Sequence, residues 1–361
     1  MRTLLAVSVL TLSVAPALAN DSTAELGTGG LILSRSDVIW MEKENLSISM
    51  DKVTVDYVFR NQSDQDVETI VAFPMPDIEA NEYVSVGIPQ GTGDNFLGFT
   101  VTVDGKPVKP ELEHKAVAVG IDVSKDLTAH NVPFFPFTEA AYAALEKLPE
   151  GVAVDWQNRG IIQIIEYDDG SGMKAHRSPY WQLKSAYWWK ATFPAQKQVK
   201  VAHEYQPSVG GTAGITFFFD GEFGGNYENY KLKYCIDRNV ERAILKAAKA
   251  NPDGYPQLTE ARLSYVLTTG GNWATGTIGD FMLTVDKGRP DAIVSFCGTG
   301  VKKIGPTTFQ MKATDYYPER DVDVLILQPY SFDAPAQAPK GSAGDVPAAR
   351  KAAGRKAGAE Q

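Results

Sequence analysis

The stretch Val53-Thr-Val-Asp-Tyr-Val-Phe59, continued by Arg60-Asn-Gln-Ser-Asp-Gln-Asp66 and an apolar run from Val67 to Phe73, indicates a β-rich fold. Apolar and polar side chains alternate strictly over residues 53–59, which is typical of a strand with one buried face. The polar residues 60–66 then separate two apolar runs. The simplest structure that this pattern predicts is a β-hairpin.

Further strands are expected along the chain, because short apolar runs recur between Gly, Pro, Asn and Asp. Helices are expected only at residues 138–148, stopped by Pro149, and at residues 240–250, whose apolar side chains share one face. Short strands at this spacing favour β-sandwiches over a parallel α/β sheet. The predicted strands are 83–88, 99–103, 161–166, 187–193, 199–205, 215–219, 263–268, 281–285, 292–297, 308–313 and 322–327.

The expected fold class is therefore mainly β, with two β-sandwich-like domains, a small helical insert and a disordered tail. We place the N-terminal β-domain at residues 20–125, the helical insert with a hairpin at 126–183 and the C-terminal β-domain at 184–333. The tail, residues 334–361, is rich in Ala, Pro, Gly, Lys and Arg and has too few apolar side chains to build a core.

Residues 1–19 have the pattern of a signal peptide: Arg2, an apolar run from Leu4 to Val14, and the small-x-small sequence Ala17-Leu18-Ala19. Cleavage there predicts a secreted or periplasmic protein that begins at Asn20. No later segment is apolar for long enough to span a bilayer, so no integral membrane segment is expected after cleavage. Residues 20–333 carry a net charge of −13, which disfavours nucleic acid as a partner.

The chain has two cysteines, Cys235 and Cys297, and we predict that they form a disulfide bond. An exported protein meets an oxidising compartment, where an even pair of cysteines is typical of a disulfide. Each cysteine lies in a strand-like run, KLKYCI and IVSFC, so the bond is expected to cross-link the C-terminal β-domain.

His203 is the histidine that most resembles part of an active site, because it lies among Trp, Phe and Pro residues in the stretch 187–211. A period of two over Val199 to Tyr205 places it on the apolar face of a strand. A histidine there is more typical of a core residue bonded to a backbone or carboxyl group than of a catalyst. The chain also lacks Gly-x-Ser-x-Gly and His-Glu-x-x-His sequences that would supply catalytic partners.

No metal or other cofactor is predicted. The four histidines, His114, His130, His176 and His203, lack the short spacing of zinc ligands, and no Gly-x-Gly-x-x-Gly or Walker sequence is present. The carboxylate clusters Asp168/Asp169 and Asp220/Glu222 could bind calcium, but neither matches a complete calcium loop, and Asp-Gly between strands is an ordinary turn.

Aromatic residues provide the leading functional hypothesis. Neighbouring rings in a strand point to opposite faces, so these strands are either covered on both sides or present rings to solvent. Exposed rings could stack on a saccharide or contact an envelope protein. We therefore expect an exported, non-catalytic binding or envelope-interaction protein of unknown ligand rather than an enzyme. The predicted binding residues are Tyr180, Trp181, Tyr187, Trp188 and Trp189.

The alternative is a carboxylate-dependent hydrolase of envelope sugars or peptides, which would combine His203 with Asp168, Asp169, Asp220 or Glu222. A glycosidase would need two carboxyl groups about 5–9.5 Å apart across a cleft. The sequence leaves that separation open.

Several segments in order resemble an exported bacterial family, domain of unknown function 4424. The resemblance spans about residues 20–329 and implies export, but the family supplies no activity to transfer. The N-terminal part also has a looser likeness to the vault/inter-alpha-trypsin domain, a β-rich interaction module, without the von Willebrand A domain that often accompanies it. The segments that carry the family resemblance are Asn20-Asp-Ser22, Gly29-Gly-Leu31, Val55-Asp-Tyr-Val-Phe-Arg-Asn61, Val71-Ala-Phe-Pro-Met-Pro76, His203-Glu-Tyr-Gln-Pro-Ser-Val-Gly-Gly211 and Ser295-Phe-Cys297; the looser likeness rests on Phe-Arg-Asn and Phe-Pro-Met-Pro.

Overall fold

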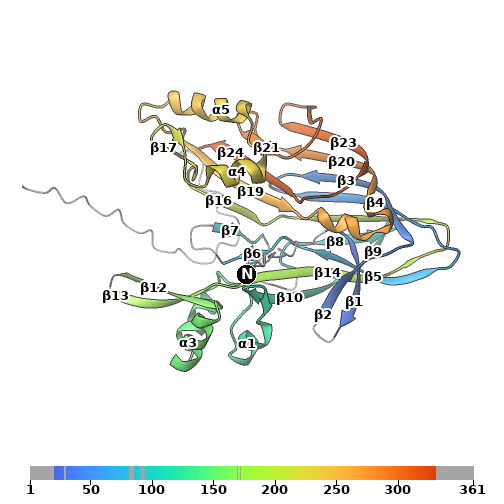
Figure 1. Ribbon diagram of the computed structural model, residues 1–361, viewed down its shortest axis with the longest axis horizontal. Helices are drawn as coiled ribbons and strands as arrows, with labels where there is room; N and C mark the ends of the chain where they lie inside the picture. Colours follow the sequence, from blue (N-terminus) through green and yellow to red (C-terminus); the bar gives the residue numbers. More distant parts are fainter. Residues whose placement is uncertain are drawn as a thin grey trace, which may run out of the picture. The chain divides into compact units, whose positions relative to one another are not determined.

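The computed structural model is mainly β, as predicted (Figure 1). It describes residues 20–27, 30–80, 85–89, 91, 93, 95–168, 170 and 172–330. The predicted signal peptide and the predicted tail lie outside these residues. Of the described residues, those within 20–78, 83–114 and 184–330 form a first compact unit, and those within 79–82 and 115–183 form a second. No helix in this part of the chain is both long enough and apolar enough to cross a membrane.

Three large sheets contain most of the strands. The eight-stranded sheet has the order β22 (Lys302–Lys303), β23 (Thr308–Tyr316), β20 (Ile278–Asp286), β3 (Ile39–Ile48), β4 (Val53–Asn61), β15 (Gln198–Tyr205), β8 (Thr100–Val103) and β9 (Lys106–Val108). The seven-stranded sheet has the order β11 (Ile121–Asp122), β10 (Glu111–Ala118), β14 (Gln182–Phe193), β5 (Val67–Pro74), β1 (Ser22–Gly27) and β2 (Gly30–Ser34), with β6 (Ile78–Glu79) on β14. The five-stranded sheet has the order β21 (Ile293–Phe296), β24 (Val322–Pro329), β19 (Leu258–Tyr265), β16 (Val209–Thr212) and β7 (Ser85–Gly87).

Strands from distant parts of the chain alternate within these sheets. In the eight-stranded sheet, β4 lies between β3 and β15, and β3 pairs in parallel with β20. The ranges that we predicted as separate N-terminal and C-terminal β-domains therefore contribute strands to the same sheets and to the same compact unit.

The hairpin predicted over residues 53–73 is wrong. β4 pairs with β3 and β15, whereas β5 pairs with β1 and β14, so residues 62–66 carry the chain from one sheet to another. The same crossing occurs between β14 and β15 at residues 194–197. The two crossings are joined by Asn61, whose Nδ2 donates to the carbonyl oxygens of Phe193 at 2.7 Å and Gln65 at 2.8 Å.

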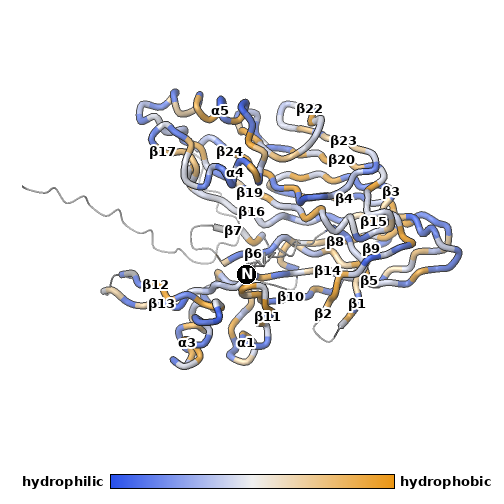
Figure 2. Tube along the Cα trace, in the orientation of Figure 1, coloured by the Kyte–Doolittle hydropathy of each residue, from blue (hydrophilic) through white to orange (hydrophobic). Residues whose placement is uncertain are grey.

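These crossings make the apolar faces of two sheets pack against each other. Phe73 of β5 and Trp189 of β14 contact the ring of His203 in β15, at ring-centroid distances of 4.9 and 5.2 Å. Figure 2 shows apolar and polar residues alternating along strands of the first unit. The alternation that suggests a hairpin is equally satisfied by two strands that face each other across a core, because it reports burial and not pairing.

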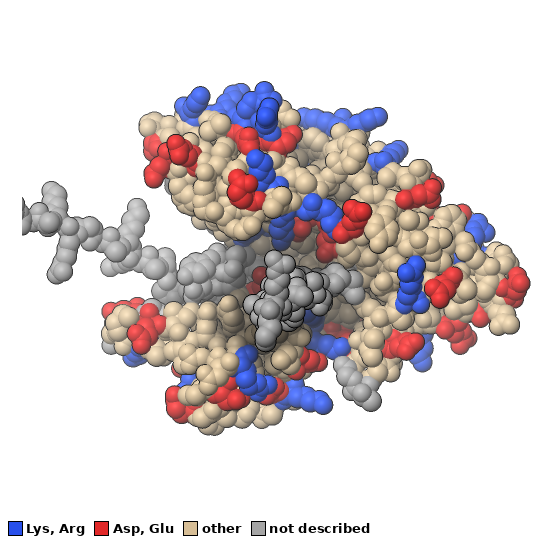
Figure 3. All heavy atoms as spheres, viewed as in Figure 1, with Lys and Arg blue, Asp and Glu red and all other residues tan. Residues whose placement is uncertain are grey.

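Two helices cover the five-stranded sheet: α4 (Tyr227–Tyr234) and α5 (Arg238–Lys249), the second of which was predicted. The short hairpin of β17 (Phe218–Phe219) and β18 (Glu222–Phe223) packs beside them. Figure 3 shows Lys and Arg side chains gathered over α5, although residues 20–333 are acidic as a whole. The cationic side chains on this helix are Arg238, Arg242, Lys246 and Lys249.

The predicted disulfide between Cys235 and Cys297 is confirmed. Its surroundings differ from the prediction at one end, because Cys235 follows helix α4 and does not lie in a strand. Its φ of 52° is left-handed, and this conformation ends the helix. The bond therefore joins the end of a helix to the end of β21.

The second unit contains α1 (Ser124–Ala129), α2 (Glu139–Glu146), α3 (Glu150–Asn158) and the hairpin of β12 (Ile162–Asp168) and β13 (Met173–Pro179). Only α2 was predicted among the helices, and Thr138 caps it by accepting the Ala141 N–H at 3.1 Å. Helix α2 ends at Glu146, before Pro149, and Pro149 is the residue that precedes α3. The core of this unit is built around Trp156 and Trp181.

Candidate functional site

His203 lies in the core of the first unit, as its place in the alternating pattern predicted. Its side chain is fully buried, and its Nε2 is 3.0 Å from Oδ1 of Asp21. The aromatic rings of Tyr57 and Phe99 also contact the imidazole. The ring is thus held by one carboxyl group and by aromatic neighbours on several strands.

His203 and Asp21 belong to a larger group of buried side chains, which we call the buried polar cluster. Asn20 is at its centre: its Nδ2 donates to Oε2 of Glu44 at 3.0 Å, and its Oδ1 accepts from the Tyr57 hydroxyl. The Tyr265 hydroxyl is 3.1 Å from Oε1 of Glu44 and 2.8 Å from the Tyr57 hydroxyl. The cluster comprises Asn20, Asp21, Glu44, Tyr57, His203, Tyr265 and Thr269.

Elements far apart in the sequence build this cluster. Glu44 lies on β3, Tyr57 on β4 and Tyr265 on β19, while Thr269 belongs to the short 3₁₀-helix η1 (Thr268–Asn272). The Thr269 hydroxyl bonds both the backbone N–H and the backbone carbonyl of Asn20. The indole N–H of Trp273, in the segment after η1, donates to the backbone carbonyl of Asp21.

Burial controls the electrostatics of the cluster. Desolvation raises the pKa of Glu44 to about 8, although hydrogen bonds from Asn20 and Tyr265 oppose the shift. Desolvation also raises the pKa of Asp21, against the attraction of His203. No Lys or Arg pairs with either carboxyl group within the described chain, and Oδ2 of Asp21 has no hydrogen-bond partner there. The cluster therefore contains two buried carboxyl groups and one imidazole.

Neither Asp21 nor Glu44 is among the site residues predicted from the sequence. Glu44 could have been found, because it shares the inward face of β3 with Leu46 and Ile48. A carboxylate at such a position is rarely buried without a partner. Asp21 gives no comparable signal, since it lies beside the predicted cleavage point rather than within a periodic run.

The predicted carboxylate clusters do not join His203. Asp220 and Glu222 are exposed around the turn between β17 and β18, whereas His203 is buried against Asp21. In the other unit, Asp168 is exposed, and its Oδ1 accepts the N–H groups of Gly170 and Gly172 at 2.8 and 2.9 Å, as in a tight turn. Asp169 lies outside the described residues. Within the described ranges, no three His, Cys, Asp or Glu side chains are placed to hold a metal ion.

The five predicted binding rings do not form a continuous exposed strip. Trp181, Tyr187 and Trp189 are at most 2% exposed, whereas Tyr180 is 54% exposed and Trp188 is partly buried. The Tyr187 ring stacks on Phe99 at 4.3 Å. Tyr187 and Trp189 lie on the buried face of β14, whereas Trp188 lies on the opposite, partly buried face. A binding role stays a prediction for the accessible atoms of Tyr180 and Trp188 only.

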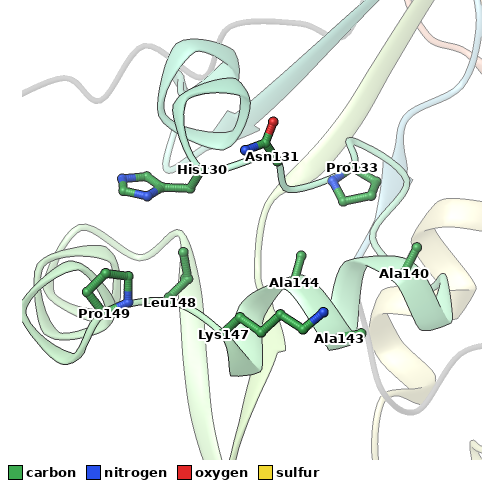
Figure 4. Close-up of a pocket in the computed structure, with 9 residues that line it drawn as sticks. All are labelled: His130, Asn131, Pro133, Ala140, Ala143, Ala144, Lys147, Leu148 and Pro149. Atoms are coloured by element: carbon green, nitrogen blue, oxygen red, sulfur yellow. The ribbon is translucent and has the colours of Figure 1, made fainter.

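A hollow of about 510 Å³ in the second unit is open to solvent (Figure 4). One wall comes from α2, through Ala140, Ala143 and Ala144, and the other from the segment after α1, through His130 and Asn131. Figure 4 shows these two segments facing each other across the space. The complete lining is His130, Asn131, Pro133, Ala140, Ala143, Ala144, Lys147, Leu148 and Pro149.

The lining combines small apolar side chains with a few polar groups. The imidazole of His130 packs edge-to-face on the buried Trp156 at 5.5 Å, which fixes the position of that ring. Lys147 is exposed and forms no ion pair with the part of the chain that the structure describes. The hollow can therefore receive an apolar group and offer a cation to an acidic one. The hollow was not predicted from the sequence, because its lining residues come from two separate segments and form no motif.

Comparison with known proteins identifies a family but no activity. The family described as "Domain of unknown function (DUF4424)" matches residues 19–325, which confirms the resemblance noted from the sequence. The likeness to the vault/inter-alpha-trypsin domain stays a prediction. The comparison with curated proteins finds no match. A solved structure from Legionella pneumophila, described as "a putative nutrient binding protein", has 14% identity and a TM-score of 0.39, and the alignment covers 86% of this chain and 70% of that chain.

Proposed function

The chain belongs to the DUF4424 family, and from that premise we propose that it is an exported, non-catalytic binding protein whose second unit holds part of its ligand in the hollow beside α2. A difference in solvent accessibility between two parts of the molecule supports this proposal. The side chains of His203 and Asp21, the one His–carboxylate pair of the cluster, are fully buried, whereas the hollow is open to solvent.

The inaccessibility of the candidate catalytic groups to a substrate also argues against the hydrolase alternative. A general acid or base must come within hydrogen-bonding distance of its substrate, directly or through one water. His203, Asp21 and Glu44 are enclosed by the core, and the exposed pair Asp220 and Glu222 lies at a turn without a histidine. A binding function requires none of these groups to reach a substrate.

The lining of the hollow suggests the chemistry of the ligand. Six of its side chains are apolar, and its cation, Lys147, is unpaired among the described residues. We propose that the ligand is an envelope protein that presents a compact apolar side chain next to an acidic group. The apolar part would displace water from the alanines of α2, and the acidic part would meet Lys147 at the rim.

Binding in the hollow can be tested by filling it. The protein is purified from its own envelope and analysed by native mass spectrometry for a retained protein partner. Ala143→Trp places a large ring in the hollow, while Val154→Trp places the same ring at an exposed position of α3 outside the lining. We expect Val154→Trp to retain the partner as the unmodified protein does, and Ala143→Trp to lose it by about tenfold or more, as for a core interface contact.

Lys147→Glu should also weaken retention, because the charge at the rim is reversed, and thermal melting should show that all variants are folded. Equal retention by Ala143→Trp and Val154→Trp would show that the hollow is not the binding site. Retention of a saccharide instead of a protein would contradict the proposed ligand class.

A further inference from the structure

Asn20, the residue expected to begin the mature chain, is completely buried in the first unit. Asp21 and Ser22 are equally inaccessible. Chain termini normally lie at the surface and are poorly ordered unless they are tied down. A predicted cleavage point followed immediately by fully buried residues therefore needs a structural explanation.

The surroundings of Asn20 fit this residue closely. Its backbone N–H and carbonyl bond the Thr269 hydroxyl, its side-chain amide donates to Glu44, and its side-chain oxygen accepts from Tyr57. Gly270 allows this approach: a Cβ there would lie only 2.8 Å from Nδ2 of Asn20. Three distant segments of the chain thus converge on one residue at the start of the predicted mature protein.

The charges of the cluster become balanced if Asn20 is a true N-terminus. Asp21 has His203 as its partner, but Glu44 receives only neutral hydrogen bonds, from Asn20 and Tyr265. A buried carboxylate without a cation is strongly unfavourable. Cleavage before Asn20 would convert its backbone N–H into an α-ammonium group, in the residue whose side chain already contacts Glu44.

We propose that cleavage after Ala19 creates this α-ammonium group and that the new N-terminus becomes an internal ligand of the buried polar cluster, with Glu44 as its counter-ion. The processed chain then has a stabilising charge pair that the precursor lacks. Removal of the signal peptide is thereby coupled to completion of the first unit. The inference rests on the predicted cleavage and is independent of binding in the hollow.

The first test compares two chains that differ only at the N-terminus. One begins at Asn20 and the other carries Ala19 as an additional residue; both end at Gln361. The α-amine and the lysines are acylated with a water-soluble reagent, and peptides are quantified by mass spectrometry. In the Asn20 chain we expect the α-amine to react about a hundredfold more slowly when folded than when unfolded, as for a group exposed only by opening. Exposed lysines provide the internal control.

The extended chain should show a freely reactive α-amine and a lower melting temperature. Failure of the extended chain to fold, while the Asn20 chain folds, would also support the proposal. Equal melting temperatures, or an α-amine of Asn20 that reacts as fast when folded as when unfolded, would overturn it. Edman sequencing of the exported protein must begin at Asn20, and any other first residue would also overturn it.

A second test removes the counter-ion. Glu44→Gln keeps hydrogen-bonding groups but removes the charge, and Glu25→Gln makes the same change at an exposed position of β1. We expect Glu44→Gln to lower the folding equilibrium constant of the Asn20 chain by about a hundredfold or more, because it leaves a buried cation unpaired. The loss should be much smaller in the extended chain, and Glu25→Gln should have little effect in either. Equal losses in the two chains would show that Glu44 does not pair with the N-terminus.

Discussion

His203 and Asp21 form a pair in which each group compensates for the burial of the other. Desolvation raises the pKa of Asp21, and the neighbouring imidazole opposes that shift. Oδ2 of Asp21 and Nδ1 of His203 have no hydrogen-bond partner in the described structure. The two side chains are therefore paired through one hydrogen bond, between Nε2 of His203 and Oδ1 of Asp21. At the scale of residues, the histidine that most resembles a catalytic group in the sequence is a buried residue paired with a carboxyl group.

Replacement of His203 by Ala should strongly destabilise the protein. The change leaves Asp21 buried without its partner and opens a void among aromatic rings, so we expect a loss of about 3–5 kcal/mol in the free energy of unfolding. Urea denaturation measures this loss. His130→Ala, which changes a partly exposed histidine, should cost less. A loss below about 1 kcal/mol for His203→Ala would mean that the pair contributes no more than an ordinary hydrogen bond.

The pKa of Glu44 predicts a pH dependence in the N-terminally extended chain described above. The folded pKa is raised from 4.5 to about 8, so the folded chain retains a proton that the unfolded chain releases. This contribution to stability is fully present below pH 4.5 and is lost as the pH rises to about 8. Asp21, whose pKa is also raised, contributes in the same direction, and His203, Tyr57 and Tyr265 face the same cluster.

Melting temperatures from pH 4.5 to 8 measure this effect, and Glu44→Gln isolates the part due to Glu44. The decline should be steeper in the extended chain than in its Glu44→Gln variant. In the chain that begins at Asn20, a neighbouring ammonium group would favour the carboxylate and flatten the decline. Identical profiles with and without Glu44 would contradict the assignment.

At the scale of elements, the organising feature is the pair of crossings between sheets. β4 pairs with β15, and β5 pairs with β14, so the two crossings connect the same two sheets. Asn61 binds the crossing at residues 62–66 to the end of β14 through the carbonyl of Phe193. A polar side chain at the end of one strand thus fixes the position of a segment 132 residues away.

Asn61→Ala should lower stability by about 1–3 kcal/mol, because the carbonyl groups of Phe193 and Gln65 lose buried donors. Denaturant unfolding provides the measurement. Asn45→Ala, on the half-buried side of β3, is the matched control and should cost about 0.5 kcal/mol or less. Similar losses for the two variants would show that the crossing does not depend on Asn61.

The neighbouring tryptophans of β14 allow a comparison of its two faces. Trp189 is 2% exposed and contacts His203, so Trp189→Ala should cost about 3–5 kcal/mol. Trp188 is only partly buried, against a small apolar cluster, and Trp188→Ala should cost less. Thermal unfolding of both variants measures the difference. A larger loss for Trp188→Ala would reverse the assignment of the faces.

At the scale of the whole molecule, the described residues of the first unit come from 20–78, 83–114 and 184–330, and those of the second unit come mainly from the intervening residues 115–183. Residues 20–78 and 184–330 supply interleaved strands, and β10 and β14 carry the chain into and out of the second unit. The disulfide then links two segments that both follow that excursion.

This organisation predicts that residues 20–125 will not fold alone. Without β14 and β15, the strands β4 and β5 lose paired neighbours, and their apolar faces lose much of the core that covers them. We expect no cooperative thermal transition by circular dichroism and poor dispersion in NMR spectra, in contrast to the chain from Asn20 to Gln361. A cooperative transition in the fragment would instead support an independent N-terminal domain.

The sequence by itself determined the β-rich class, because alternation reports burial on a strand, and it determined the cysteine pair and the family. It also placed His203 on an apolar face. Only the tertiary structure decided that β4 and β5 cross between sheets, that Asp21 is the partner of His203, and that Asn20 and Glu44 meet in the core. The physical reason is the sequence separation of the residues involved. Alternation depends on adjacent residues, whereas strand pairing and charge compensation depend on distant groups that only the folded chain brings together.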